Sequence, residues 1–290
     1  MREKRIHAER AKHHSLQTAF IFFIVIFLLI IGSFAIKLVS ILQQSLFDGD
    51  HRFTILFENA NDKKKDGLLL SFSPSEKTMS LLQLENLKST SFQKMSVISG
   101  TPIDAFVTFA KPVGMETVEN TKDVTVLLQT GIKQYQSLHT NLTIVDFVRL
   151  WFFAKGVIGY NISEKEYTLL KNNMSATDPV LDKMISSLFT DATISQEKMT
   201  IHVVNASGGI GLGNRLARVL TNTGGNVIAV STADQIYPIS QIAVIQKDRY
   251  TVKKLARFLR MPVVSLSKRD GALSDIVIII GKDRSSFFSL

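Results

Sequence analysis

The longest apolar run of the chain lies near its N-terminus and predicts a membrane-spanning helix. No charged residue occurs from Ser15 to Ile36, and residues 19–31 are almost wholly apolar. A helix of about 20 residues, rising about 1.5 Å per residue, crosses the hydrocarbon layer of a membrane. A cleaved signal peptide has an apolar core of only about 7–15 residues, followed by a small-x-small site. The run here is longer and lacks such a site, which favours an uncleaved signal anchor over residues 15–41.

Charges on either side of this run predict its orientation. Five bases precede it, whereas the residues just after it include Lys37, Asp48 and Asp50. Because lysine and arginine mark the cytoplasmic side, we expect residues 1–14 to form a cytoplasmic tail and the rest of the chain to be exported. The expected location is the cell membrane, as a single-pass protein with extracytoplasmic domains. Cytoplasmic dehydrogenases and kinases are disfavoured, because ATP and NAD(P)H are scarce outside the cell.

Short apolar runs and helix-start signals predict a middle α/β domain over residues 50–189. Phe53–Phe57 has the pattern of a strand, and Leu68–Phe72 and Lys77–Leu84 flank a hairpin turn at residues 73–76. Capping signals then predict three helices. They are Phe147–Phe153 after Thr143–Asp146, Tyr167–Leu170 after the box Ser163–Glu166, and Val180–Phe189 after Asp178–Pro179.

Beyond a polar stretch at residues 190–199, which we interpret as a linker, the pattern predicts a small C-terminal α/β domain. We expect two helices packed on a four- to five-stranded sheet over residues 200–284, because each helix has one apolar face. The expected strands are Ile201–Ala206, Asn226–Ser231, Gln241–Gln246, Val263–Leu266 and Ile276–Gly281, and the expected helices are Gly211–Thr223 and Thr251–Arg260.

A glycine-rich turn at the start of this domain has the local pattern of a nucleotide-binding loop. A dinucleotide fingerprint needs a third glycine where Asn214 stands, and no Gly-Lys-Ser/Thr follows. Fewer than about a hundred residues follow the strand, too few for a complete dinucleotide fold. We interpret the glycines as a sharp turn into a helix, with an anion site at the helix N-terminus as the alternative. The loop residues are Asn205, Ser207, Gly208, Gly209 and Gly211.

Composition narrows the chemistry further. The 290 residues contain no cysteine, which excludes disulfides, thiolate metal sites and a cysteine nucleophile. Three of the six histidines lie in the N-terminal tail, and His51, His139 and His202 lack metal-ligand spacing. The sequence therefore predicts no metal site.

Positive charge is concentrated in the C-terminal domain. The net charge of the chain is +9, of which the tail carries +3, and residues 242–270 hold eight bases against two acids. Lys253, Arg257 and Arg260 fall at i, i+4 and i+7 of the second helix, opposite its apolar face. This stripe is either a solvated face or a contact with phosphate-bearing polymer, peptidoglycan carboxylates or lipid headgroups. The candidate binding residues are Lys253, Lys254, Arg257, Arg260, Lys268 and Arg269.

Motifs at both ends of this domain resemble the LytR C-terminal domain. Val204–Gly208 follows a strand, Gly211-Leu212 opens a helix, and Asp275–Asp283 closes the segment. The family pattern is strand-Leu-Asn-Gly-Thr/Ser-Gly, then Gly-Leu-Ala, and a closing Asp-Ile-Val with Gly-x-Asp. The resemblance covers residues 200–284, with Ala206 in place of the usual glycine and Gly213 in place of the usual alanine.

The middle domain resembles a degenerate LytR–CpsA–Psr domain, which often precedes that module. In the family this domain transfers lipid-pyrophosphate-linked glycopolymers to peptidoglycan with magnesium. Lys64-Lys65-Asp66 stands where the family has Arg-x-Asp, and Leu84-Glu85-Asn86-Leu87 stands where it has Ile-Pro-Arg-Asp. The arginine and aspartate groups that would bind pyrophosphate and metal are thus replaced or altered. The remaining catalytic candidates are Lys64, Asp66 and Arg149, although Arg149 also fits an exposed helix face.

Two functions from different classes follow. The first is a membrane-anchored, non-catalytic envelope protein, a pseudoenzyme without a cofactor, whose C-terminal domain binds wall material, anionic envelope polymer or a protein partner. The alternative is a divergent LytR–CpsA–Psr phosphotransferase that uses magnesium. Nucleic acid is excluded as a partner by the predicted export, although the charge alone would allow it.

Overall fold

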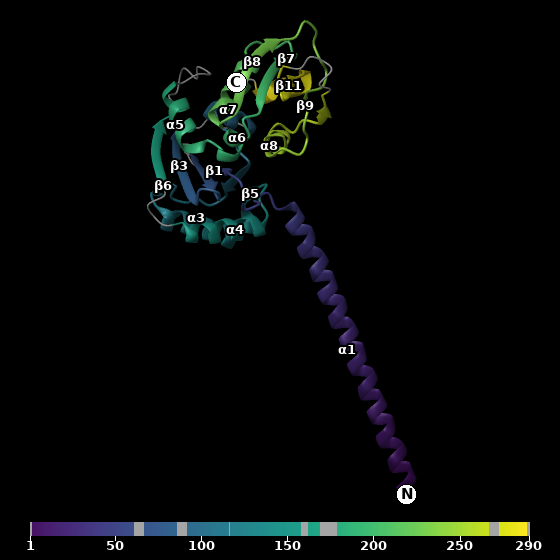
Figure 1. Cartoon of the computed structure of the whole chain (residues 1–290). Coiled ribbons are helices and arrows are strands. Elements are labelled where there is room, and N and C mark those ends of the chain that lie inside the picture. The colour runs from purple at the N-terminus through teal and green to yellow at the C-terminus, as the bar shows by residue number, and fades with distance from the viewer. Residues whose placement is uncertain are drawn as a thin grey trace. The chain divides into compact units, whose positions relative to one another are not determined.

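The structure is a computed structural model, and it describes residues 2–60, 67–85, 92–115, 117–157, 162–168, 179–266 and 273–288. It consists of two units, Met1–Ser45 and Leu46–Leu290. Figure 1 shows the single long helix of the first unit and the two sheets of the second. The mixed α/β class expected from the sequence is therefore confirmed.

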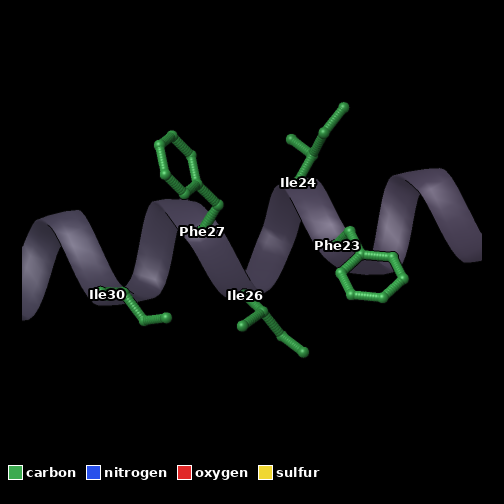
Figure 2. A pocket seen from close by; sticks show the side chains of 5 residues that line it. All are labelled: Phe23, Ile24, Ile26, Phe27 and Ile30. Atoms are coloured by element: carbon green, nitrogen blue, oxygen red, sulfur yellow. The ribbon is translucent and has the colours of Figure 1, made fainter.

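The first unit is the helix α1, Arg2–Gln44. Within it, Phe22–Gln44 has a mean hydropathy of 2.8 and is long and apolar enough to cross a membrane. Figure 2 shows Phe23, Ile24, Ile26, Phe27 and Ile30 projecting from different sides of this helix, and all five are exposed. A helix that is apolar on all sides has no polar face for water, which is typical of a membrane span. The shallow apolar hollow between these side chains belongs to that surface.

The second unit begins with a mixed six-stranded sheet in the order β5-β4-β1-β2-β3-β6. The hairpin of β2 and β3 turns at Pro74–Lys77, as the sequence predicts. β1 pairs antiparallel with β2 and parallel with β4, and β2 pairs antiparallel with β3, so the segment between β3 and β4 must cross the sheet. The strands are β1 Phe53–Asn59, β2 Gly67–Ser73, β3 Thr78–Glu85, β4 Ala105–Phe109, β5 His139–Thr140 and β6 Ile162–Thr168.

Helices cover both faces of this middle sheet, which explains the continuous apolar run of β2. Leu68, Leu70 and Phe72 pack in the cluster that includes residues of α3 and α4, whereas Leu69 packs in the cluster that includes residues of α2 and α5. Alternate residues of a strand point to opposite faces, so both sets must be apolar. The helices are α2 Phe92–Ser99, α3 Thr121–Lys133, α4 Ile144–Gly156 and α5 Pro179–Phe189, with a 3-10 turn at Tyr135–Ser137.

One helix prediction is wrong. The helix predicted at Tyr167–Leu170 begins instead as part of β6, which also contains its capping box Ser163–Glu166 and pairs parallel with β3 from Met79 to Glu85. Residues 169 and 170 lie outside the described residues. Pairing along the exposed side of β3 satisfies the backbone of the segment and overrides its local helix signal. The helix starts at Thr143 and Pro179 are confirmed, while Asp178 lies outside the described residues.

The C-terminal sheet has five strands in the order β10-β9-β11-β7-β8, and the predicted set is confirmed. β7 pairs parallel with both β11 and β8, and β11 pairs antiparallel with β9. Residues of α7 and α8 form one core with the inward-facing residues of the sheet. The elements are β7 Thr200–Asn205, α7 Leu212–Asn222, β8 Asn226–Thr232, β9 Gln241–Val244, α8 Tyr250–Leu259, β10 Val263–Ser265, β11 Ile276–Ile280, a 3-10 turn at Lys282–Arg284 and α9 Ser285–Phe288.

The polar stretch interpreted as a linker contains a helix, α6, Ala192–Glu197. Asp191 caps it by accepting hydrogen bonds from the amides of Thr193 and Ile194, and the side chain of Ile194 is buried. The helix is six residues long, too short for an apolar period to show in the sequence. The only local sequence signals for this helix were therefore its capping residue, Asp191, and one apolar residue, Ile194.

Two capping boxes of the middle domain differ in burial. In α4, Asp146 is 0% exposed, and its carboxylate accepts hydrogen bonds from the amide and hydroxyl of Thr143 at 2.7 and 2.8 Å and from the amide of Phe47 at 2.9 Å. In α3, the corresponding bonds between Asn120 and Asp123 are exposed to solvent. Asp146 therefore also fixes the segment that precedes β1.

We expect Asp146→Ala to lower the free energy of unfolding by about 3 kcal/mol, because it removes a cap and leaves buried donors without an acceptor. Asp123→Ala is the matched control and should cost about 1 kcal/mol or less. Urea unfolding of residues 46–290 measures both values. Equal losses in the two variants would contradict the role assigned to burial.

Candidate functional site

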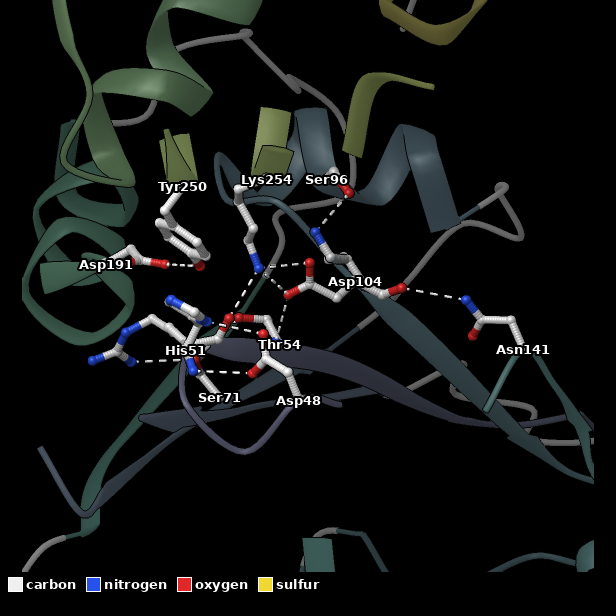
Figure 3. A network of polar contacts seen from close by, with 12 residues as sticks. Asp48, His51, Thr54, Ser71, Ser96, Asp104, Asn141, Asp191, Tyr250 and Lys254 are labelled. Atoms are coloured by element: carbon white, nitrogen blue, oxygen red, sulfur yellow. Dashed lines mark hydrogen bonds and ion pairs between the residues drawn. The ribbon is translucent and has the colours of Figure 1, made fainter. Parts of the chain in front are cut away.

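A buried ion pair joins α8 to the middle sheet (Figure 3). Nζ of Lys254 lies 2.7 Å from both carboxylate oxygens of Asp104 and donates to the carbonyl of Arg52 at 2.9 Å. The side chains of Lys254 and Asp104 are only 8% and 5% exposed. Asp104 precedes β4 and also accepts a hydrogen bond from the amide of Thr54 in β1. The lysine is therefore directed at the point where two neighbouring strands begin.

Arg52 is another buried charged residue beside the ion pair of Lys254 and Asp104. It donates to the carbonyl of Leu188 at 3.0 Å, to the hydroxyl of Ser71 at 3.2 Å and to the carboxylate of Glu76 at 2.8 Å. Burial lowers the pKa of Arg52, and the charge of Glu76 opposes that shift. Arg52 and Glu76 line a cavity of about 340 Å³. The other polar side chains of its wall belong to Thr78, Ser80, Ser187, Thr190, Ser195 and Gln196.

Tyr250, the first residue of α8, connects three segments at this junction. Its hydroxyl donates to Asp191 at 2.7 Å, and its ring stacks on the ring of His51 with 3.9 Å between centroids. His51 in turn lies 2.9 Å from the carboxylate of Asp48. Burial and the nearby charge of Asp191 raise the pKa of Tyr250, so it remains a protonated donor.

Glu197, the last residue of α6, supplies the N-terminal cap of α8. Its carboxylate accepts hydrogen bonds from the amides of Tyr250 and Thr251 at 3.0 and 2.8 Å and from the hydroxyl of Thr251. Burial acts to raise the pKa of Glu197, but the hydrogen bonds from Thr251 lower it overall. Arg249, the residue before α8, makes no side-chain cap, so a residue distant in sequence takes this role.

α7 contacts the middle domain through a second polar cluster. Arg218 lies 2.6 Å from Asp182 of α5 and donates to the carbonyls of Val97 and Ile98 at the end of α2. Asn222 donates to the same aspartate at 2.8 Å. Because α7 and α8 are both tied to the middle domain, the C-terminal sheet is held in one orientation.

The basic residues of α8 divide between two faces. Lys253 and Arg257 are exposed, as the helical spacing predicts, and so is Arg260, which follows α8 as its C-terminal cap. Lys254 is buried in the ion pair with Asp104 and cannot contact an external polymer, so its assignment as a surface binding residue is corrected. Lys268 and Arg269 lie outside the described residues.

The glycine loop is held by its own side chains. The carboxamide of Asn205 accepts from the hydroxyl of Ser207 at 2.7 Å and donates to the carbonyl of Gly209 at 2.6 Å. The hydroxyl of Ser207 accepts from the amide of Gly209 at 3.1 Å. Gly208 and Gly211 have φ values of 80° and 75°, which glycine adopts without strain. The loop is a self-bonded turn into α7, consistent with the structural interpretation of its glycines.

The three catalytic candidates are not brought together among the described residues. Lys64 and Asp66 lie outside them. Arg149 donates to the carbonyl of Phe47, whose ring packs on Phe53 at the start of β1. Phe53 begins β1, whereas Gly67, the first described residue of β2, pairs with Glu58 near the other end of β1. Among the described residues there is also no group of three or more His, Asp or Glu side chains that could hold a metal ion.

Asp104, Arg52, Asp191 and Glu197 were not recognised as important in the sequence. Each carries out its role through a partner at least 24 residues away, such as Glu76 for Arg52. A periodicity argument tests neighbours within a few residues and cannot detect such pairs. The one available signal was Lys254 itself, which falls beside the apolar face of its helix rather than opposite it.

We expect Lys254→Met to lower the free energy of unfolding by about 3 kcal/mol or more, because it leaves the carboxylate of Asp104 buried without a cation. Adding Asp104→Asn should restore much of the loss, since the pair is then uncharged while the amide of Thr54 keeps an acceptor. Lys253→Met, in the exposed neighbour, is the matched control and should change stability by about 0.5 kcal/mol or less. Urea unfolding of the four proteins tests this, and equal effects of the two lysine variants would refute it.

Comparison with solved structures finds likenesses of low similarity. The transcriptional regulator yvhJ from Bacillus subtilis is 16% identical, with a TM-score of 0.34, over 46% of this chain and 94% of that chain. TagV from B. subtilis is 12% identical, with a TM-score of 0.28, over 41% and 85% of the two chains. TagT bound to LIIa-WTA is 11% identical, with a TM-score of 0.32, over 49% and 93%. TM-scores this low support no argument about function.

The sequence comparison is informative for one segment. No curated protein matches the chain. Residues 198–283 match the model of the LytR_C family, described as the LytR cell envelope-related transcriptional attenuator. These residues coincide with the C-terminal sheet, its two helices and the self-bonded glycine loop. The chain therefore carries a LytR C-terminal domain at residues 198–283.

Proposed function

We propose that the protein is a membrane-anchored component of the bacterial cell envelope, and that its LytR C-terminal domain binds anionic envelope polymer through α8. The observation that carries the proposal is the exposed basic face formed by Lys253, Arg257 and Arg260. The family description places relatives of this domain in a cell-envelope context, and α1 has the length and composition of an anchor.

The opposite side of α8 supports this assignment. Lys254, Tyr250 and the backbone at the helix start are fixed to the middle domain and to α6. Only the exposed side is available to a partner. Lys253 and Arg257 are presented on a helix that cannot turn, and Arg260 caps its C-terminal end. Preorganised charges lose less conformational entropy on binding than charges on a flexible segment. A phosphate-bearing polymer suits this face, because one guanidinium group can donate two parallel hydrogen bonds to the oxygens of a phosphate.

A catalytic role has less support. Arg149 is engaged with the backbone before β1, and the junction places its buried charges in pairs that stabilise the structure. We therefore propose a non-catalytic binding protein that requires no cofactor. The magnesium-dependent phosphotransferase remains the alternative function, and it would depend on Lys64 and Asp66.

The orientation in the membrane is the first testable part. Since five bases precede the apolar run, a periplasmic-type reporter fused after Leu290 should be active outside the cytoplasm. Reporter activity in intact cells and protease accessibility in spheroplasts measure this. Protection of the reporter from protease in intact spheroplasts would contradict the proposed topology.

Binding to wall material is the second testable part. We expect the triple variant Lys253→Glu, Arg257→Glu and Arg260→Glu to lose retention of residues 46–290 on isolated cell wall at low salt. Exposed charges attract polyanions through a sum of screened contacts, so retention of the parent should also fall steeply with salt. Sedimentation of the protein with wall fragments measures retention.

The matched control reverses three exposed lysines of the middle domain, Lys111, Lys122 and Lys133, which gives the same change in net charge. This variant should be retained nearly as well as the parent. Unchanged melting temperatures verify that both variants fold. Full retention of the α8 variant, or equal losses in the two variants, would refute a specific role for α8.

A further inference from the structure

The outer side of α4 carries two adjacent aromatic side chains and a lysine. Phe152 is 63% exposed, and the half-buried ring of Trp151 packs edge-on against it with 5.0 Å between centroids. The ammonium of Lys155 lies 3.7 Å from the centroid of the Trp151 ring. Aromatic rings beside a long basic side chain are typical of the boundary between lipid and water, where the rings reach the acyl chains and the charge stays hydrated.

The exposed charges of α4 are basic. They are Arg149 and Lys155, because the one acid of the helix, Asp146, is buried in its capping box. α3 lies beside α4 on the same face of the middle sheet (Figure 1) and adds no net charge, since its two lysines are balanced by Asp123 and by Glu119 just before the helix. α4 therefore combines apolar and basic groups, as helices that bind anionic lipid do.

α4 is also bonded to the residues that follow the candidate membrane span. The amide of Phe47 donates to Asp146 at 2.9 Å, and its carbonyl accepts from Arg149 at 3.1 Å. The ring of Phe47 packs on Phe153 of α4 with 6.2 Å between centroids. The candidate span ends at Gln44, and three residues of chain reach at most about 11 Å. In a membrane-anchored chain, Phe47 and the helix bonded to it therefore stay near the lipid surface.

We propose that the side of α4 formed by Trp151, Phe152 and Lys155 lies on an anionic lipid surface, with the two rings at the level of the headgroups. This inference rests on the membrane anchoring that is part of the proposed function. Lipid phosphates suit the bases of α4, and the acyl chains next to them suit the rings.

The short connection allows a small contact of this kind to form. Two aromatic side chains and two bases would bind a vesicle only weakly if the domain were free in solution. Tethering converts this binding into an intramolecular step with a high effective concentration of lipid. The helix loses little entropy on contact, because its capping box and the ring of Phe47 already hold it in place.

Trp151 is the only tryptophan of the chain, so its fluorescence tests the contact directly. The full chain is reconstituted in bilayers of phosphatidylglycerol, with and without bromine on the acyl chains. Because bromine quenches a ring at the lipid boundary, Trp151 should be at least about twofold dimmer in the brominated bilayer.

Two comparison positions are made in a Trp151→Phe background. Phe27→Trp places the probe in the candidate span and should be quenched at least as strongly. Thr221→Trp places it on the exposed side of α7, which contacts α5 on the opposite face of the middle sheet, and should not be quenched.

A surface variant determines whether the side chains of α4 make the contact. Phe152→Ser removes an exposed ring and should reduce the quenching of Trp151 by at least about half, each variant being compared with itself in unbrominated lipid. Val180→Ser is the matched control, because Val180 of α5 is also 63% exposed, and it should leave the quenching unchanged. Unchanged melting temperatures verify that both variants fold.

The outcomes separate the contact from the anchor. An unquenched Trp151 beside a quenched probe at position 27 would overturn the lipid contact and leave the anchor intact. If the probe at position 27 is not quenched, the proposed anchoring fails, and the inference fails with it. Equal quenching at positions 151 and 221, or full quenching in the Phe152→Ser variant, would also overturn the assigned surface.

Discussion

A lysine that is withdrawn from water needs a counter-charge, and this requirement organises the junction of the second unit. Asp104 supplies the charge, and it lies where β1 and β4 begin side by side. Because the ammonium also donates to the carbonyl of Arg52, rotating α8 would leave a buried cation and a buried carboxylate apart. The position of the helix, and the side of it that meets solvent, follow from this single pairing.

The remaining contacts of the junction act in the same direction. Glu197 caps α8 from the end of α6, Asp191 binds Tyr250, and Arg218 binds Asp182. In each of these contacts, an acidic side chain from residues 104–197 binds a hydrogen-bond donor of the C-terminal domain. The LytR C-terminal domain thus carries more bases than it exposes, because some of them hold it in place.

The sequence predicted the elements whose signals are local. Apolar periodicity located β7, α7 and α8, and the glycines of the loop were correctly assigned to a turn. It failed where a distant partner decides the outcome. Ser163–Glu166 forms a strand because it pairs with the backbone of β3. Lys254 points inward because it forms an ion pair with Asp104. No pattern within the segment itself contains that information.

The helix α6 determines how binding at the C-terminal domain would affect the motion of the middle domain. A flexible ten-residue connection has an end-to-end distance of about 18 Å and would let one domain settle on a surface while the other diffused. With α6 folded and bonded at both ends, that independent diffusion is lost. If α8 binds a polymer as proposed, the middle domain is immobilised with it, and the loss of translational and rotational entropy is incurred once for both.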